Sequence, residues 1–223
     1  MPSVARAKEF HPAFEEYCEA IWELREDDID VIQARIAERL EVSRPAVSEM
    51  IRRMETEGLI EIGSTIGLTS SGRELAERVV RRHRLAERFL TDVLGLSWAD
   101  AHDEAGKWEH VISEPVETAL ARVLDNPTTC PHGNPIPGAA YLPPDMQPLR
   151  DVEVGTSFTV TRIPEELEFE PGMLEFLEQH SLQPGHTGVL TVISPDGTAT
   201  VEIDGAHVGV PAFASQRILV SAV

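Results

Sequence analysis

Two short amphipathic segments separated by a three-residue break constrain the fold of this chain most strongly. The segments cover residues 31–40 and 44–54, and each carries apolar residues at spacings of three and four, as in a helix with one buried face. Between them, Ser43 is a good helix N-cap and Pro45 suits a first helical turn. The pattern predicts two helices joined by a tight turn, a helix-turn-helix.

A short β-hairpin is expected directly after the second helix. Gly58 ends that helix, residues 60–62 and 68–69 are candidate strands, and the turn between them contains Gly63 and Gly67. This layout is typical of a winged helix-turn-helix, so we assign residues 1–74 to a DNA-binding domain of that kind. A winged helix used for protein contacts is the alternative, and the acidity of this region favours it.

The exposed face of the second helix offers side chains that suit contact with DNA. Arginine and hydroxyl groups bind phosphates, and the first turn of such a helix reaches base edges. Glu49 either accepts from a cytosine amine or is simply solvated. The candidate DNA-binding residues are Ser43, Arg44, Pro45, Ser48, Glu49, Arg52 and Arg53.

Charge and cysteine content exclude several classes of protein. The 223 residues include 19 Lys+Arg and 38 Asp+Glu, a net charge of −19, which excludes binding to nucleic acid through bulk positive charge. Two distant cysteines make no disulfide framework, and we see neither a membrane span nor a secretory signal, so we expect a cytoplasmic protein. The motifs of nucleotide-binding enzymes and hydrolases are absent, so we expect neither an enzyme nor a small-molecule substrate.

Three regions that differ in proline content and in the spacing of their apolar residues follow the winged helix. Residues 75–126 have a helical pattern, residues 127–150 contain seven of the 16 prolines, and residues 151–223 alternate as short strands separated by turns. We therefore expect an α+β protein with a helical domain at 75–126, a proline-rich linker at 127–150 and a small bent sheet or barrel at 151–223, including one helix near 171–180.

Imidazole and carboxylate groups recur in the helical region at spacings that suit a metal site. His83 and Glu87 lie four residues apart and so share one helix face. Further groups of the same types are His102, Glu109, His110, Cys130 and His132. Such groups on facing helices form metal sites in helical bundles. The alternative is that His83, which lies among three arginines, belongs to a basic helix surface.

A broad apolar stripe over residues 108–124 indicates a helix that packs against another surface. A helix pair beside a helix-turn-helix usually forms a dimer, because two-fold DNA sites need a two-fold protein. The alternative is a core helix within one chain.

Five stretches of the chain resemble the diphtheria-toxin-repressor family of metal-dependent transcriptional regulators, which has iron-responsive and manganese-responsive branches. They are residues 34–40, 83–88, 102–105, 108–111 and 132–138, and the resemblance extends over nearly the whole chain. The resemblance implies a winged-helix domain, a helical dimerisation and metal-binding domain, and an SH3-like (FeoA-type) C-terminal domain. It also implies a homodimer that represses transcription by binding double-stranded operator DNA.

The resemblance further implies two metal sites per subunit. One would use His83, Glu87, His102, Cys130, His132 and Glu170, and the other would use Glu16, Glu19, Glu109 and His110. The family has a cysteine or glutamate four residues before His110, where this chain has Gly106, so the first site is the more secure. A carboxylate at position 16 and no thiol at 106 favour Mn²⁺, whereas Cys130 favours a softer ion. Fe²⁺ is therefore the alternative, with Co²⁺ and Zn²⁺ as substitutes in vitro.

Overall fold

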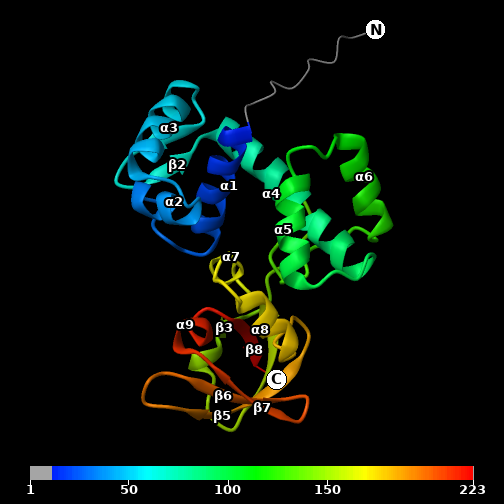
Figure 1. The fold of residues 1–223 in the computed structure, drawn as a ribbon. Coiled ribbons are helices and arrows are strands. Elements are labelled where there is room, and N and C mark those ends of the chain that lie inside the picture. The colour runs from blue at the N-terminus through cyan, green and yellow to red at the C-terminus, as the bar shows by residue number, and fades with distance from the viewer. Residues whose placement is uncertain (1–11, 223) are drawn as a thin grey trace. The chain divides into compact units, whose positions relative to one another are not determined.

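The structure, a computed structural model, describes residues 12–222 and divides into two compact units at Val80 and Arg81 (Figure 1). The first unit is a winged helix-turn-helix, as predicted. Its elements are α1 (Pro12–Glu26), α2 (Gln33–Arg39), α3 (Arg44–Thr56), β1 (Ile60–Ile62), β2 (Ile66–Leu68) and the beginning of α4 (Ser70–Asp92). β1 and β2 form an antiparallel hairpin in which Ile62 pairs with Ile66.

The start of α3 follows the capping signals of the sequence. The Ser43 side chain accepts a hydrogen bond from the backbone N–H of Ala46, and Pro45 lies in the first turn. The apolar faces of the helices meet in one core, whose fully buried members include Cys18, Ile21, Ile36, Val47, Ile51, Met54 and Leu59. Burial of these side chains holds α3 in place and leaves its opposite face exposed.

The second unit begins with a helical layer. The rest of α4 packs with α5 (Trp98–Trp108) and α6 (Glu114–Val123) around a small apolar core that includes Leu85, Leu90, Ala101, Ala105, Ile112 and Leu120. Ser113 is the N-cap residue of α6 and Pro115 lies in its first turn, so the chain restarts a helix there.

The C-terminal part of the second unit is a six-stranded antiparallel sheet in the order β3-β8-β4-β5-β6-β7. The strands are β3 (Gln147–Pro148), β4 (Ser157–Arg162), β5 (Thr187–Ile193), β6 (Ala199–Ile203), β7 (Ala206–Val210) and β8 (Leu219–Ala222). Register shifts in β4 and in β5 bend the sheet, as β-bulges do. The short helices are η1 (Leu149–Asp151), α7 (Glu165–Glu168), α8 (Met173–Gln179) and α9 (Ala212–Ser215).

Part of the proline-rich segment is buried rather than extended in solvent. Cys130, His132 and Asn134 have no exposed surface, and Ile136 has 1%. Turns and backbone hydrogen bonds, including Cys130 N–H to the Asn134 carbonyl at 2.9 Å, give this stretch a fixed shape.

No helix within residues 12–222 has the length and apolar character needed to cross a membrane.

Two helical glycines are expected to respond in opposite ways to alanine. A Cβ at Gly106 in α5 would meet nothing within 4 Å, so Gly106→Ala should raise the free energy of unfolding by about 0.5–1 kcal/mol. A Cβ at Gly72 in α4 would lie 1.9 Å from the Leu59 carbonyl oxygen. Gly72→Ala should therefore lower the free energy of unfolding by about 2–3 kcal/mol. Urea unfolding of both variants measures the difference, and a destabilised Gly106→Ala protein would contradict the open surroundings of Gly106.

Candidate metal centre

The i, i+4 spacing on α4 brings His83 and Glu87 together, and α5 adds His102. Glu87 Oε1 lies 3.2 Å from His83 Nε2 and 3.0 Å from His102 Nδ1. One ligand atom from each residue lies within 4.8 Å of the other two. Three residues of the predicted first site are thus gathered at one point between two helices.

The loop after α6 brings Cys130 and His132 to the same carboxylate. Glu87, Cys130 and His132 form a second group of ligand atoms within 4.8 Å of one another, and all three are buried. The loop can lie against β4 because Gly133 has no side chain: its φ is +88°, and a Cβ there would lie 2.2 Å from the Thr161 carbonyl oxygen. The Ile163 N–H donates to the His132 carbonyl at 2.8 Å and holds the loop there.

Glu168 of α7, which was not among the residues predicted from the sequence, also lies in the cluster. Its Oε2 atom lies 2.8 Å from His132 Nδ1 and 3.3 Å from His102 Nδ1. Glu170, the residue predicted from the C-terminal part of the chain, is exposed and lines a pocket of about 280 Å³ together with His102 and Glu168. The sequence feature that could have pointed to Glu168 is its i, i+3 spacing from Glu165, which places both carboxylates on one face of α7.

The candidates for the second site are divided between the two units. Glu109 accepts a hydrogen bond from His83 at 2.5 Å, and His110 Nε2 lies 3.2 Å from the other Glu109 oxygen. Glu16 and Glu19 lie on α1 of the first unit, where Glu16 is exposed and Glu19 is buried. Glu109 therefore links His110 to the cluster around Glu87.

The arginines around His83 do not form an exposed basic surface. Arg84 is fully buried, donates to Glu165 at 2.7 Å and also donates to the Pro135 carbonyl. Arg81 and Arg82 both donate to Glu117, at 2.8 and 3.1 Å. These contacts connect α4 to α6, α7 and the loop, and they support the walls of the cluster.

Burial and pairing act in opposite directions on the ionisable groups. Burial lowers the pKa of His83, but the carboxylates of Glu87 and Glu109 outweigh it and raise that pKa well above its usual value. Burial likewise lowers the pKa of His102, but Glu168 and Glu87 raise it to about 10.

The pKa values of the buried carboxylates and of the Cys130 thiol are also shifted. Burial raises the pKa of Glu87, but His132 and His83 lower it well below its usual value. Burial and the Glu87 carboxylate raise the pKa of Glu168, but His132 and His102 together outweigh them and lower it to about 2. Burial raises the pKa of the Cys130 thiol well above its usual value, and Glu87 adds to the effect. Without a cation the cluster is held together by protonated imidazoles.

The donor set fits a divalent transition metal. Among residues 12–222, His132 Nε2 and Glu87 Oε2 are buried atoms without a hydrogen-bond partner, and His83 Nε2 has only its 3.2 Å ion-pair contact with Glu87. A buried polar atom left in this way costs about 1–3 kcal/mol, so a cation bound by all of them would remove several such costs. Imidazole, carboxylate and thiolate together suit Mn²⁺, Fe²⁺, Co²⁺ or Zn²⁺ better than an all-oxygen ion such as Ca²⁺.

The predicted DNA-binding residues share one face of the first unit. Ser43, Arg44, Pro45, Glu49, Arg52 and Arg53 are exposed, and Ser48 is half-buried. Arg52 donates to the Ser48 hydroxyl at 3.1 Å, and the Arg53 guanidinium lies 5.4 Å from the centre of the Phe14 ring. Arg44, Arg52 and Arg53 therefore place positive charge on the exposed part of α3.

A winged helix-turn-helix in the same chain as a buried imidazole, carboxylate and thiol cluster is the arrangement of a metal-dependent transcriptional regulator. Two family descriptions match the chain: "Iron dependent repressor, N-terminal DNA binding domain" over residues 9–68, and "Iron dependent repressor, metal binding and dimerisation domain" over residues 69–138. Together these matches cover more than half of the chain.

Individual proteins agree with the family matches. The iron-dependent repressor IdeR of Mycobacterium tuberculosis is 39% identical over 204 residues, which cover 86% of this chain and 88% of that protein. The diphtheria toxin repressor of Corynebacterium diphtheriae is 49% identical over 130 residues, 57% of this chain and 58% of that protein. A solved structure described as a manganese-dependent transcriptional repressor in complex with manganese has a TM-score of 0.84 at 32% identity, and covers 94% of this chain and all of that one.

The chain therefore belongs to the iron-dependent repressor family, the family of the diphtheria toxin repressor. It is a metal-dependent transcriptional repressor and not an enzyme, as the sequence analysis predicted.

Metal binding is expected to compete with protons. Metal ligands must be neutral imidazole or thiolate, whereas His102 with a pKa of about 10 and Cys130 with its raised pKa hold protons at neutral pH. Raising the pH should therefore strengthen binding, by about tenfold per pH unit for each proton released. Titration of Co²⁺ by absorbance from pH 6 to 8, with calorimetry in buffers of different ionisation enthalpy, measures the effect. An affinity that does not change with pH would show that the ion does not use these groups.

Proposed function

We propose that this repressor is activated by Mn²⁺ and binds operator DNA as a homodimer, to control genes of metal homeostasis. The observation that carries the proposal is the buried cluster of His83, Glu87 and His102, joined by Glu168, in the same chain as a winged helix. Cys130 and His132 are proposed as further ligands of the same ion. The dimer is supported by the family match, which includes a dimerisation domain.

The choice of Mn²⁺ over Fe²⁺ rests on the hardness of the donors. At least two carboxylates face the cluster, Glu87 and Glu168, and Gly106 supplies no thiol. The solved repressor with a TM-score of 0.84 is described as manganese-dependent. Cys130 and the similarity to IdeR favour Fe²⁺, which is therefore the second candidate.

A bound ion would supply positive charge at the centre of the cluster. Its role would be to draw together α4, α5, the loop at 130–134 and α7, because each contributes at least one ligand group. His83 and Glu87 lie on α4, the helix whose first turns belong to the winged-helix unit. α4 therefore connects the proposed metal centre directly to the winged-helix unit, so a change at the metal centre can affect DNA binding through this helix.

The first test is DNA binding by the full chain as metal is added. If the ion raises DNA affinity about 100-fold, the coupling is about 2.7 kcal/mol, and DNA must tighten metal binding by the same factor. Fluorescence anisotropy with operator-containing genomic fragments, under anaerobic conditions, compares Mn²⁺ with Fe²⁺, Co²⁺ and Zn²⁺. Activation by Fe²⁺ at concentrations where Mn²⁺ has no effect would replace manganese with iron, and equal DNA affinity with and without every ion would contradict the proposal.

A matched pair of glutamate variants tests which C-terminal carboxylate holds the ion. Glu168→Gln removes a buried charge that faces two imidazoles, so metal affinity should fall about tenfold or more. Glu170→Gln changes an exposed residue two positions away and should have little effect. Calorimetric titration with Mn²⁺ compares the variants, and circular dichroism checks that both are folded. A larger loss in Glu170→Gln would restore Glu170 as the ligand that the resemblance implies.

Arg52 is expected to contact the DNA backbone. Arg52→Gln should weaken binding of different DNA sequences by similar factors and reduce the slope of log affinity against log salt by about 1. Arg150→Gln is the control, because Arg150 is an exposed arginine of the other unit. Anisotropy at several salt concentrations gives the slopes, and an unchanged slope in Arg52→Gln would remove Arg52 from the phosphate contacts.

The second metal site implied by the resemblance stays a prediction. Glu19→Gln and His110→Gln should each lower the number of Mn²⁺ ions bound per subunit without removing the ion held at Glu87. Equilibrium dialysis counts the ions, and an unchanged number in both variants would show that these residues hold no second ion.

A further inference from the structure

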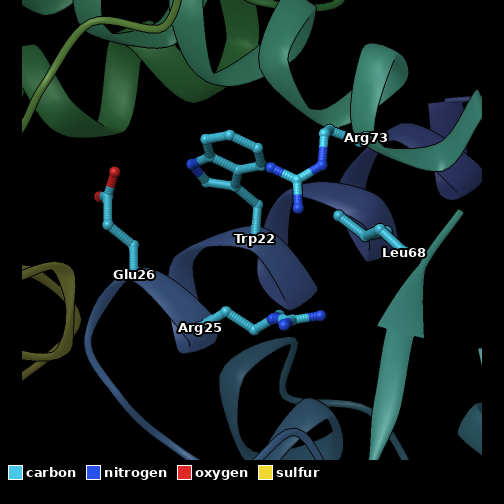
Figure 2. Close-up of a pocket in the computed structure, with 5 residues that line it drawn as sticks. All are labelled: Trp22, Arg25, Glu26, Leu68 and Arg73. Carbon is cyan, nitrogen blue, oxygen red and sulfur yellow. The ribbon is translucent and has the colours of Figure 1, made fainter. Parts of the chain in front are cut away.

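A cavity in the winged-helix unit carries charged groups that are neither candidate metal ligands nor candidate DNA-binding residues. It has a volume of about 200 Å³ and is lined by Trp22, Arg25, Glu26, Leu68 and Arg73 (Figure 2). These residues come from the end of α1, the end of β2 and the first turn of α4. All of them belong to the first unit, so the cavity is complete within it.

Two guanidinium groups at this cavity lack a carboxylate partner. Within residues 12–222, neither Arg25 nor Arg73 forms an ion pair, whereas Arg35, Arg39 and Arg78 of the same unit pair with glutamates. Figure 2 shows the Arg73 guanidinium beside the Trp22 indole, 5.5 Å from the ring centre, and the Arg25 guanidinium on the same side of the cavity. The chain carries 38 Asp+Glu against 19 Lys+Arg, so two arginines without an acidic partner give this cavity a local positive charge that the chain as a whole does not have.

The rest of the lining is suited to an organic molecule. The Trp22 ring and the Leu68 side chain offer apolar surface beside the charges. The Trp22 indole N–H is buried and has no acceptor among residues 12–222. Buried donors normally have a partner, so this N–H, which lies at the end of the ring away from the Arg73 guanidinium in Figure 2, is open to an acceptor.

We propose that this cavity binds a small organic anion, with its carboxylate or phosphate group at Arg25 and Arg73 and its apolar part against Trp22 and Leu68. Two positive charges and one negative charge, that of Glu26, leave the lining with a net positive charge. Arginine binds carboxylates and phosphates through paired N–H donors. The volume lies below the roughly 300–1,000 Å³ of pockets for drug-sized ligands, so the ligand is small. A bound anion would join α1, β2 and α4 and so stabilise the winged-helix unit.

The test uses the full chain without metal or DNA and two probes, sodium benzoate and inorganic phosphate. Proton–nitrogen NMR of the tryptophan indoles should show a saturable shift of the Trp22 signal, identified by its loss in Trp22→Phe. The signals of Trp98 and Trp108, which lie in the other unit, should stay in place. A shift with benzoate alone would identify a carboxylate ligand with an apolar part, and a shift with phosphate alone would identify a phosphate compound.

Variants that change one charge each distinguish specific binding of the anion in the cavity from weak binding elsewhere on the surface. Arg25→Gln and Arg73→Gln should each weaken binding by about tenfold or more, since each removes charged hydrogen bonds. Glu26→Gln should tighten it, because it removes a repelling charge. Arg35→Gln is the matched control, an exposed arginine of the same unit that pairs with Glu38. Arg25 and Arg73 are also exposed, so their substitution spares the core.

Two results would overturn the proposal. One is the absence of a saturable Trp22 shift with either probe. The other is equal affinity in Arg73→Gln and Arg35→Gln. Because neither metal nor DNA is present, such a failure would leave the proposed metal-dependent repression untouched.

Discussion

The second unit depends on one buried carboxylate, that of Glu87. Only 1% of Glu87 is exposed, and imidazoles from α4, α5 and the loop at 130–134 surround it. A buried charge without partners would cost several kcal/mol, so these three segments must stay in register for Glu87 to remain ionised. The same constraint that shapes the fold also gathers the candidate metal ligands, because every group that neutralises Glu87 is of a type that binds metals. Outside the cluster, Asn134 fixes the carboxylate of Glu168 with a 2.7 Å hydrogen bond, and Arg84 anchors the preceding turn of α7 through Glu165.

The parts of this structure that were predictable from the sequence are those encoded locally. The helix-turn-helix follows from apolar spacing and from the cap at Ser43, and the His83–Glu87 pair follows from one helical turn. The strands β4 to β7 follow from alternating residues between turn signals. The family assignment came from short stretches of sequence, and the comparisons confirm it.

The features of the structure that could not be predicted from the sequence depend on contacts between distant segments. Glu165, Glu166, Glu168 and Glu170 are chemically alike, and only the packing of α7 decides that Glu168 faces the imidazoles while Glu170 faces solvent. The strands β3 and β8 are short and pair with each other across about 70 residues, so periodicity carries little information about them. The burial of Cys130 and His132 within a proline-rich stretch has a similar origin, because it requires Gly133 to lie against the backbone of β4.

The large negative charge of the chain limits how a metal ion can act. One divalent ion changes a net charge of −19 by at most two units, and each proton that leaves His102 or Cys130 on binding reduces that change. Bulk attraction between protein and DNA therefore changes little, since a protein of this net charge would have to bind phosphates through local positive groups such as the candidate arginines of α3. A metal effect on DNA affinity must instead come from a difference in metal affinity between two arrangements of the protein. The proposed ligands come from four separate segments, α4, α5, the loop at 130–134 and α7, so an ion bound by all of them would favour the arrangement in which these segments meet.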